Sequence, residues 1–129
     1  MKYIFILLLF LSVINHSNAE PVSTGSIYFL SKNEISSLSQ KANQGDSDSA
    51  FRLHKYYSLS IHDDKKSIYW LKISGKNGNK VAIYDISYYY AYRCNFKAAK
   101  YWANKFSDAD AENHTKTMAM IKDFSRQCK

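Results

Sequence analysis

Two stretches of the chain decide its fold: residues 45–57 read GDSDSAFRLHKYY, and residues 78–90 read GNKVAIYDISYYY. In each stretch a glycine is followed by a helix-capping residue type and then by apolar side chains at intervals of three and four, the pattern of an amphipathic helix. The two stretches align at a shift of 33 residues. The aligned pairs are Gly45 with Gly78, Leu53 with Ile86, and Tyr57 with Tyr90.

The similarity continues into a second helix of each unit. Tyr69-Trp70 recurs as Tyr101-Trp102, and Asp63 recurs as Asn95, both at a shift of 32. A single helical hairpin cannot bury its apolar face, whereas two stacked hairpins share a core. We therefore predict two helical repeats, at about 46–78 and 79–108. We expect the Trp of each second helix to pack against the Tyr that closes each first helix.

Further helices are expected on both sides of the two repeats. Ser31 and Glu34 fit a capping box that starts a helix stopped by Gly45. A last helix at 109–127 would cap the stack through Met118, Ile121 and Phe124. A polar break is expected at residues 58–63, and Gly75 and Gly78 are expected to end the second repeat helix. The predicted fold is all-α, a right-handed stack of antiparallel helix pairs in one domain, residues 31–129.

The N-terminus has the organisation of an export signal. Lys2 precedes an apolar run, IFILLLFLSVI at residues 4–14, and Ser17 and Ala19 are small residues before a cleavage point. The alternative is a membrane anchor, but a spanning helix needs about 20 apolar residues. We predict a signal peptide at residues 1–19, a flexible segment at 20–30, a periplasmic or secreted location, and no stable membrane insertion after cleavage.

Charge and cysteine content limit the classes of partner and the compartment that we expect. The net charge of +7 comes from scattered lysines rather than blocks, and export argues against nucleic acid as a partner. The two cysteines, Cys94 and Cys128, would meet an oxidising compartment, where a pair tends to form a disulfide. Two free thiols are the alternative.

Motifs for catalysis, metals or cofactors are not found in the sequence. The histidines lack metal-ligand spacing, and His62-Asp63-Asp64 fits a solvated turn that caps a helix better than a cation site. His54 lies beside a core position and is interpreted as a packed residue. There is no nucleophile elbow and no phosphate loop. We therefore expect no enzyme, no catalytic residues, no metal and no cofactor.

The repeated residues resemble the Sel1-like repeat family, a relative of tetratricopeptide repeats. The first copy matches the family pattern at Ala50, Leu53, Tyr57, Asp63, Lys66-Ser67, Trp70, Ser74-Gly75 and Gly78, and the second at Ile83, Ile86, Tyr90, Asn95, Ala98-Ala99 and Trp102. The resemblance spans Gly45 to Asp108. It departs from the pattern where His54 and Ser87 replace a glycine and Phe106-Ser107 replaces a pair of small residues, so the helix-crossing angle is left open.

The resemblance implies a protein-binding module whose first helices line a concave face. Tyr84, Tyr88 and Tyr92 form an aromatic stripe at intervals of four, and at the repeat shift Tyr84 and Tyr88 align with Phe51 and Lys55. We predict that these five residues line a partner-binding face, because Tyr is favoured at interfaces. The alternative is that the flanking helices cover the rings and make them core.

Some proteins that resemble this family neutralise secreted antibacterial effectors, including lipases. The resemblance therefore suggests an immunity protein or inhibitor in the bacterial periplasm, with a toxin effector as partner. Two alternatives stay open: a periplasmic scaffold or secreted factor that meets host proteins, and, less favoured, a small hydrolase of envelope polymers.

Overall fold

The computed structural model describes residues 24–128, so the predicted signal peptide at 1–19 lies outside the described residues. Within residues 24–128 the chain is helical and has no strand, which confirms the predicted all-α class. The elements are α1 (Thr24–Ile27), α2 (Lys32–Asn43), α3 (Ser47–Lys55), η1 (Tyr56–Ser60), α4 (Asp64–Lys76), α5 (Lys80–Tyr92), α6 (Phe96–Ala103), η2 (Asp108–Asp110) and α7 (Ala111–Gln127).

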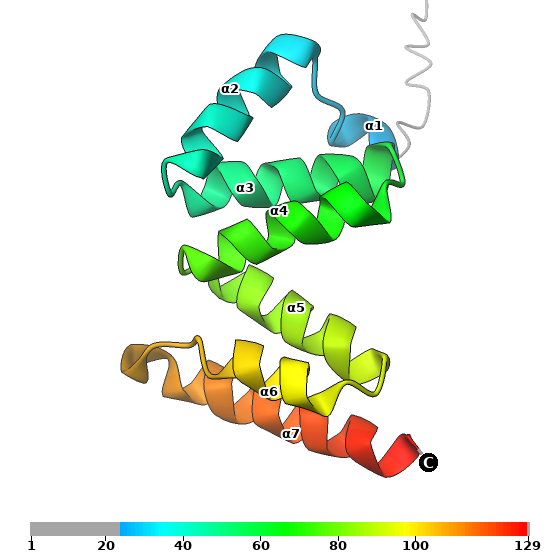
Figure 1. The fold of residues 1–129 in the computed structure, drawn as a ribbon, viewed down its shortest axis with the longest axis vertical. Coiled ribbons are helices and arrows are strands. Elements are labelled where there is room, and N and C mark those ends of the chain that lie inside the picture. Colours follow the sequence, from blue (N-terminus) through cyan, green and yellow to red (C-terminus); the bar gives the residue numbers. More distant parts are fainter. Residues whose placement is uncertain (1–23, 129) are drawn as a thin grey trace, which may run out of the picture.

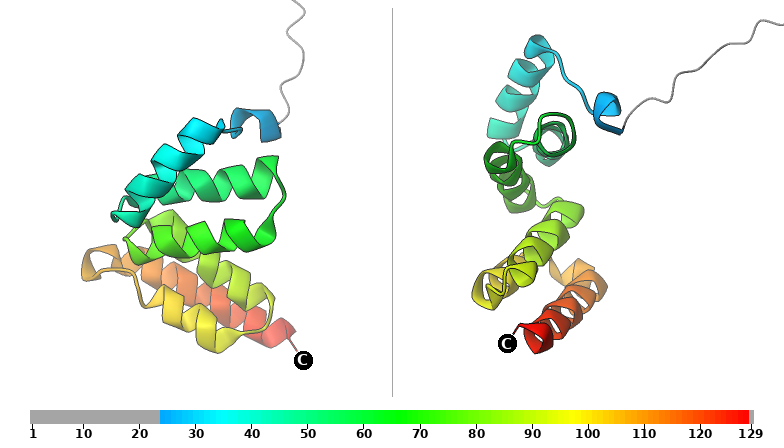
Figure 2. Two further views of the ribbon diagram at one scale, coloured as in Figure 1. Left: turned by 45° about the horizontal axis from the view of Figure 1, so that its top comes forward. Right: turned by 90° about the vertical axis from the view of Figure 1, so that its right-hand side faces the viewer.

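The helices stack in chain order. Each helix from α2 to α6 packs against the next, and α7 packs against both α5 and α6 (Figures 1 and 2). The helices α4 and α5 meet at the turn that joins them and spread apart toward their other ends (Figure 1). This divergence separates the first hairpin, α3–α4, from the second, α5–α6, on one side of the molecule.

The helix starts follow the capping residues that the sequence indicates. The Ser31 and Glu34 side chains form the predicted capping box of α2. Asp46, Asp63 and Asn79 each accept a hydrogen bond from a backbone N–H in the first turn of α3, α4 and α5. Because these bonds are local, they fix the helix starts without help from tertiary packing.

The turns of the two hairpins are equivalent. The residue before each first-helix cap has a left-handed backbone, with φ of 100° at Gly45 and 90° at Gly78. The inner turns match as well, because His62 and Cys94 both have φ of 58°. Since these turns lie 33 and 32 residues apart, the backbone has the period that the sequence repeat predicts.

The core is built around the repeated aromatic and aliphatic residues. Trp70 and Trp102 are both buried, as are Leu53 and Ile86. Gly75 is the second-last residue of α4, and Gly78, with φ of 90°, follows the end of the helix, so α4 ends where the two glycines were expected to end it. A Cβ on Gly75 would stand 3.3 Å from Ile86 Cδ1 and 3.3 Å from Trp102 Cζ3, so a glycine here lets the two hairpins approach closely.

The end of the first repeat helix differs from the sequence prediction. The predicted break at residues 58–63 begins instead as a π-helical turn, η1, in which the Ile61 N–H donates to the Tyr56 carbonyl oxygen. This wider turn makes Tyr56 the buried ring that joins the Trp70 cluster, with the predicted core residue Tyr57 half-buried beside it. A π-helical turn changes which side chain faces the core, and it often marks a functional region.

Both ends of the domain also differ in detail from expectation. The packed chain begins before the predicted boundary at Ser31, because residues 24–27 form α1 and Leu30 is buried with α2 and α3. At the other end the cysteines pair as predicted: Cys94 and Cys128 Sγ atoms lie 2.01 Å apart. The bridge ties the α5–α6 turn to the end of α7.

Candidate functional site: a charged aromatic groove between the hairpins

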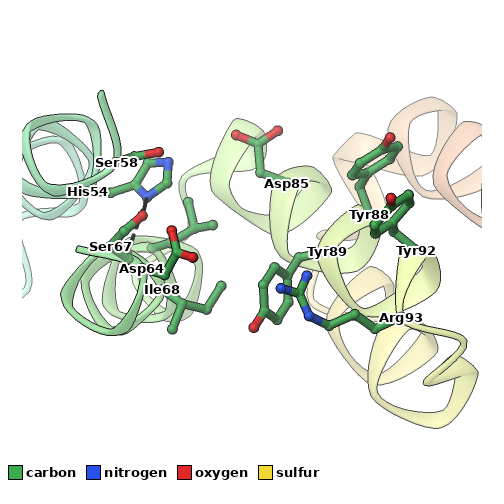
Figure 3. A pocket seen from close by; sticks show the side chains of 11 residues that line it. His54, Ser58, Asp64, Ser67, Ile68, Asp85, Tyr88, Tyr89, Tyr92 and Arg93 are labelled. Atoms are coloured by element: carbon green, nitrogen blue, oxygen red, sulfur yellow. Dashed lines mark hydrogen bonds between the residues drawn. The ribbon is translucent and has the colours of Figure 1, made fainter. Parts of the chain in front are cut away.

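A groove of about 350 Å³ lies where the two hairpins diverge, and we call it the inter-hairpin groove. One wall comes from α3, η1 and α4, through His54, Ser58, Asp64, Ser67, Ile68 and Leu71. The other wall is the outer half of α5, through Asp85, Tyr88, Tyr89, Tyr92 and Arg93. Figure 3 shows Asp85 between the His54–Ser67 pair on one side and the Tyr88 and Tyr92 rings on the other.

Two of the five predicted interface residues line this groove. Tyr88 and Tyr92 stack with ring centroids 6.3 Å apart and planes 12° from parallel. Phe124 of α7 contacts both rings edge-on, yet Tyr88 keeps 45% and Tyr92 64% of its surface exposed. The last helix therefore supports the two rings from behind without covering them.

The other three predicted residues lie beside or away from the groove. Phe51 contacts the His54 ring, with centroids 5.6 Å apart, and Lys55 Nζ lies 5.1 Å from the centroid of Phe51. These two residues stand at the groove's edge. Tyr84 is exposed but lines a separate hollow between α5 and α7, together with Phe106 and Lys116. The stripe predicted from helical spacing is thus divided between two surfaces.

His54 is a wall residue that the sequence analysis treated as packing. Its Nδ1 lies 2.9 Å from Ser67 Oγ and 3.2 Å from the Ser67 carbonyl oxygen. Burial lowers the pKa of the imidazole below its ordinary value, against opposing contributions from the Ser67 backbone and the charge of Asp85. With Nδ1 protonated the ring donates to the Ser67 carbonyl oxygen, and with Nδ1 unprotonated it accepts the Ser67 hydroxyl hydrogen. Either contact holds α3 against α4 at this point.

Asp85 is a half-buried carboxylate on the α5 wall. Burial raises its pKa above the ordinary value, and the charges of His54 and Lys55 only partly oppose this. None of the residues from 24 to 128 forms an ion pair with Asp85, although five ion pairs occur elsewhere in this part of the chain. The sequence signal for Asp85 was weak, because a single acid on an amphipathic helix is ordinarily solvated.

Arg93 completes the α5 wall and is already engaged by an aromatic ring. Its guanidinium carbon lies 3.9 Å from the centroid of Tyr89, the distance of a close cation–π contact. Figure 3 shows the guanidinium stacked against the Tyr89 ring. This contact orients the arginine along the wall, with the face of the guanidinium against the ring and its N–H donors at the edge.

One pair of groove residues has the spacing of a nucleophile and its base. Ser67 Oγ lies 2.9 Å from His54 Nδ1, and Ser67 lines the groove with only 7% of its surface exposed. Across residues 24–128 there is no group of three or more His, Cys, Asp and Glu side chains that could hold a metal ion. None of the helices described is long and apolar enough to cross a membrane.

A second hollow, with an apolar lining, has a different chemistry. It measures about 470 Å³, lies between α6 and α7, and is lined by residues such as Phe96, Met118 and Ile121. It contains neither a carboxylate nor an imidazole. The inter-hairpin groove is therefore the better site candidate, because aromatic, acidic and basic groups converge there.

Comparisons with known proteins place few limits on the function. No family model matches the chain, and no solved structure matches it. The chain is 28% identical over 119 residues to a protein of Escherichia coli (strain K12) named "Uncharacterized protein YibG". That similarity covers 81% of this chain and 75% of the relative.

Proposed function

We propose that the chain is an exported, non-enzymatic module that binds another protein through the inter-hairpin groove. In this proposal residues 1–19 are removed on export, and the processed chain acts in the periplasm. The partner is a secreted antibacterial effector, such as a lipase, which the chain neutralises as an immunity protein or inhibitor.

The observation that carries the proposal is the exposed aromatic pair on the α5 wall. Tyr88 and Tyr92 are held by Phe124 and by each other, so little conformational freedom is lost when a partner covers them. Tyrosine rings in such positions are enriched among the residues that dominate binding energy. Charged groups on both walls add the polar complementarity that specific recognition requires.

Two further features support an exported repeat module. The matched turns and buried tryptophans of the two hairpins are in keeping with the Sel1-like resemblance, whose members bind other proteins. The Cys94–Cys128 bridge suits an oxidising compartment such as the periplasm. Against an enzyme stands the burial of Ser67, the one hydroxyl placed beside an imidazole in the groove.

The test compares paired tyrosine variants as baits. Protein from cells expressing the full chain, and its Tyr88→Ala/Tyr92→Ala variant, would be immobilised and exposed to the periplasmic fraction. The matched control is Tyr69→Ala/Tyr101→Ala, because these tyrosines are 54% and 55% exposed, occupy equivalent positions in the two hairpins, and lie outside the groove. We expect one stoichiometric partner to bind the unmodified and control baits, and to bind the groove variant at least about thirtyfold more weakly.

The outcomes separate the candidate functions. Inhibition of the captured protein's toxic activity at equimolar chain supports the immunity role, whereas a captured protein with no toxicity supports the scaffold role. If the groove variant keeps its circular dichroism melting curve and still retains the partner as well as the control does, the groove is not the binding site. Turnover of an envelope polymer by the purified chain would instead support the hydrolase alternative.

A further inference from the structure

The charges of the inter-hairpin groove are unevenly paired. Of the basic groups at its walls and edge, Arg93 is stacked on Tyr89, and Lys55 lies over the rings of Phe51 and Tyr28. The carboxylate of Asp85 has no ion pair among residues 24–128. Arg93 and Lys55 also form no ion pair there, so neither base is bonded to the Asp85 carboxylate, although the chain as a whole carries a net charge of +7.

The second carboxylate of the groove is in a different situation. Asp64 lies in the first turn of α4, where the helix N-terminus stabilises a negative charge. Asp85 lies in the middle of α5 and has no such support. Its burial also raises its pKa, because a partly buried carboxylate loses solvation when it is ionised.

The surroundings of Asp85 suit a cation with an apolar stem. Tyr88 and Tyr92 stand on the same wall, and the face of a tyrosine ring attracts cations as well as covering methylene groups. A groove of about 350 Å³ that is open to solvent has room for one long side chain from a protein surface. His54 faces Asp85 from the opposite wall, and the charges of His54 and Lys55 lower the pKa of Asp85 less than burial raises it.

We infer that the inter-hairpin groove receives a lysine or arginine side chain of the partner protein, with the cationic group at Asp85 and the stem against Tyr88 and Tyr92. This inference rests on the proposed function and adds the chemistry of the contact. An acidic partner side chain is disfavoured, because it would meet the two carboxylates that line the groove, Asp85 and Asp64. The basic group of the partner would complete a pairing that the free chain leaves open.

The inference can be tested without the partner. Chemical shifts of the ¹⁵N-labelled protein would be followed during titration with N-acetyl-arginine methylamide. Titration with the citrulline analogue, which has the same shape without the charge, and with N-acetyl-glutamate methylamide would give the comparison. We expect saturable shifts at Asp85, Tyr88 and Tyr92 with arginine, and binding about tenfold weaker for citrulline, the scale of one charge-assisted hydrogen bond.

A pair of acid variants provides the matched control. Asp85→Asn should weaken arginine binding about tenfold, to the level of the citrulline analogue. Asp108→Asn removes the same charge from an exposed position outside the inter-hairpin groove and should leave arginine binding unchanged. Melting curves of both variants check that the fold is kept.

Several results would overturn the inference. Equal binding of arginine and citrulline by the unmodified protein would do so, and this comparison does not depend on any variant folding. Equal binding by Asp85→Asn and Asp108→Asn, or stronger binding of the glutamate analogue, would also do so. If arginine fails to bind but the tyrosine variants still discriminate in partner capture, only this inference fails; if arginine binds but no partner depends on the tyrosines, only the proposed function fails.

Discussion

The disulfide between Cys94 and Cys128 should contribute much of the stability of the domain. The two cysteines are separated by 34 positions in the sequence. For a closed loop of this length, the chain-entropy model assigns about 4 kcal/mol of stabilisation at 25 °C. This is a large share of the ~5–15 kcal/mol that stabilises an ordinary small domain. The variant Cys94→Ser/Cys128→Ser should therefore melt about 15–20 °C below the oxidised chain.

A second variant separates the loss of the bridge from the backbone preference at Cys94. This residue follows the C-terminal cap of α5 with φ of 58°, a left-handed conformation that glycine adopts more easily than other residues. The variant Cys94→Gly/Cys128→Ser, which also lacks the bridge, should be about 0.5–1 kcal/mol more stable than the double serine variant. This figure allows for the greater conformational entropy that glycine has in the unfolded chain. Both variants lack the bridge, so their difference reports the turn alone.

The assay is thermal and urea unfolding followed by circular dichroism, with the unmodified chain measured in oxidising and in reducing buffer. Reduction of the unmodified chain should reproduce the melting temperature of the double serine variant. If reduction leaves the melting temperature unchanged, the bridge does not stabilise the chain by restricting its unfolded state. If the glycine variant is no more stable than the serine variant, the left-handed backbone at position 94 does not cost stability.

Three further predictions concern single positions. Gly75→Val should lower the urea midpoint by the equivalent of about 1–3 kcal/mol, because the added atoms overlap Ile86 and Trp102; an unchanged midpoint would mean that the hairpins do not meet there. Burial raises the pKa of Asp85, so the unfolded chain loses this proton at a lower pH than the folded chain does, and the stability of the fold falls as the pH rises from the ordinary Asp pKa to the raised one. Asp85→Asn should therefore be at least as stable as the unmodified chain at neutral pH. In thermal melts below the ordinary pKa, the variant should lose that advantage. His62→Gly should stabilise the chain by about 0.5–1 kcal/mol in the same unfolding assay, since His62 has φ of 58°, and a loss of stability would show a side-chain role for His62.

The helices and their order could be predicted from the sequence because their signals are local. Capping residues such as Ser31, Asp46 and Asn79 bond to amides two or three positions away, so their effect can be read from a short window. The repeat also predicted which helices pair. Leu53 and Ile86 occupy the same position in their repeats, so they are expected to pack in the same way. Burial of both tryptophans follows from the same spacing.

The groove could not be predicted because it depends on the angle between the two hairpins. His54 and Asp85 are 31 positions apart and face each other only because α4 and α5 diverge. Helical spacing grouped Tyr84 with Tyr88 and Tyr92, but α7 divides that stripe by packing along α5. The π-helical turn at Tyr56 likewise depends on tertiary packing and carries no clear signal in a short window.

The groove residues include positions at which the two repeats differ, although Tyr89 aligns with an identical residue, Tyr56. At the shift of 33, His54 aligns with Ser87 and Asp85 aligns with Arg52, whereas the core pair Leu53 and Ile86 keeps its apolar character. A position that is buried in the same way in both hairpins needs a similar residue type in both. A position that serves a partner need occur only once, where the hairpins diverge. The repeat therefore distinguishes the shared core of the stack from most of the residues that line the groove, Asp85 among them.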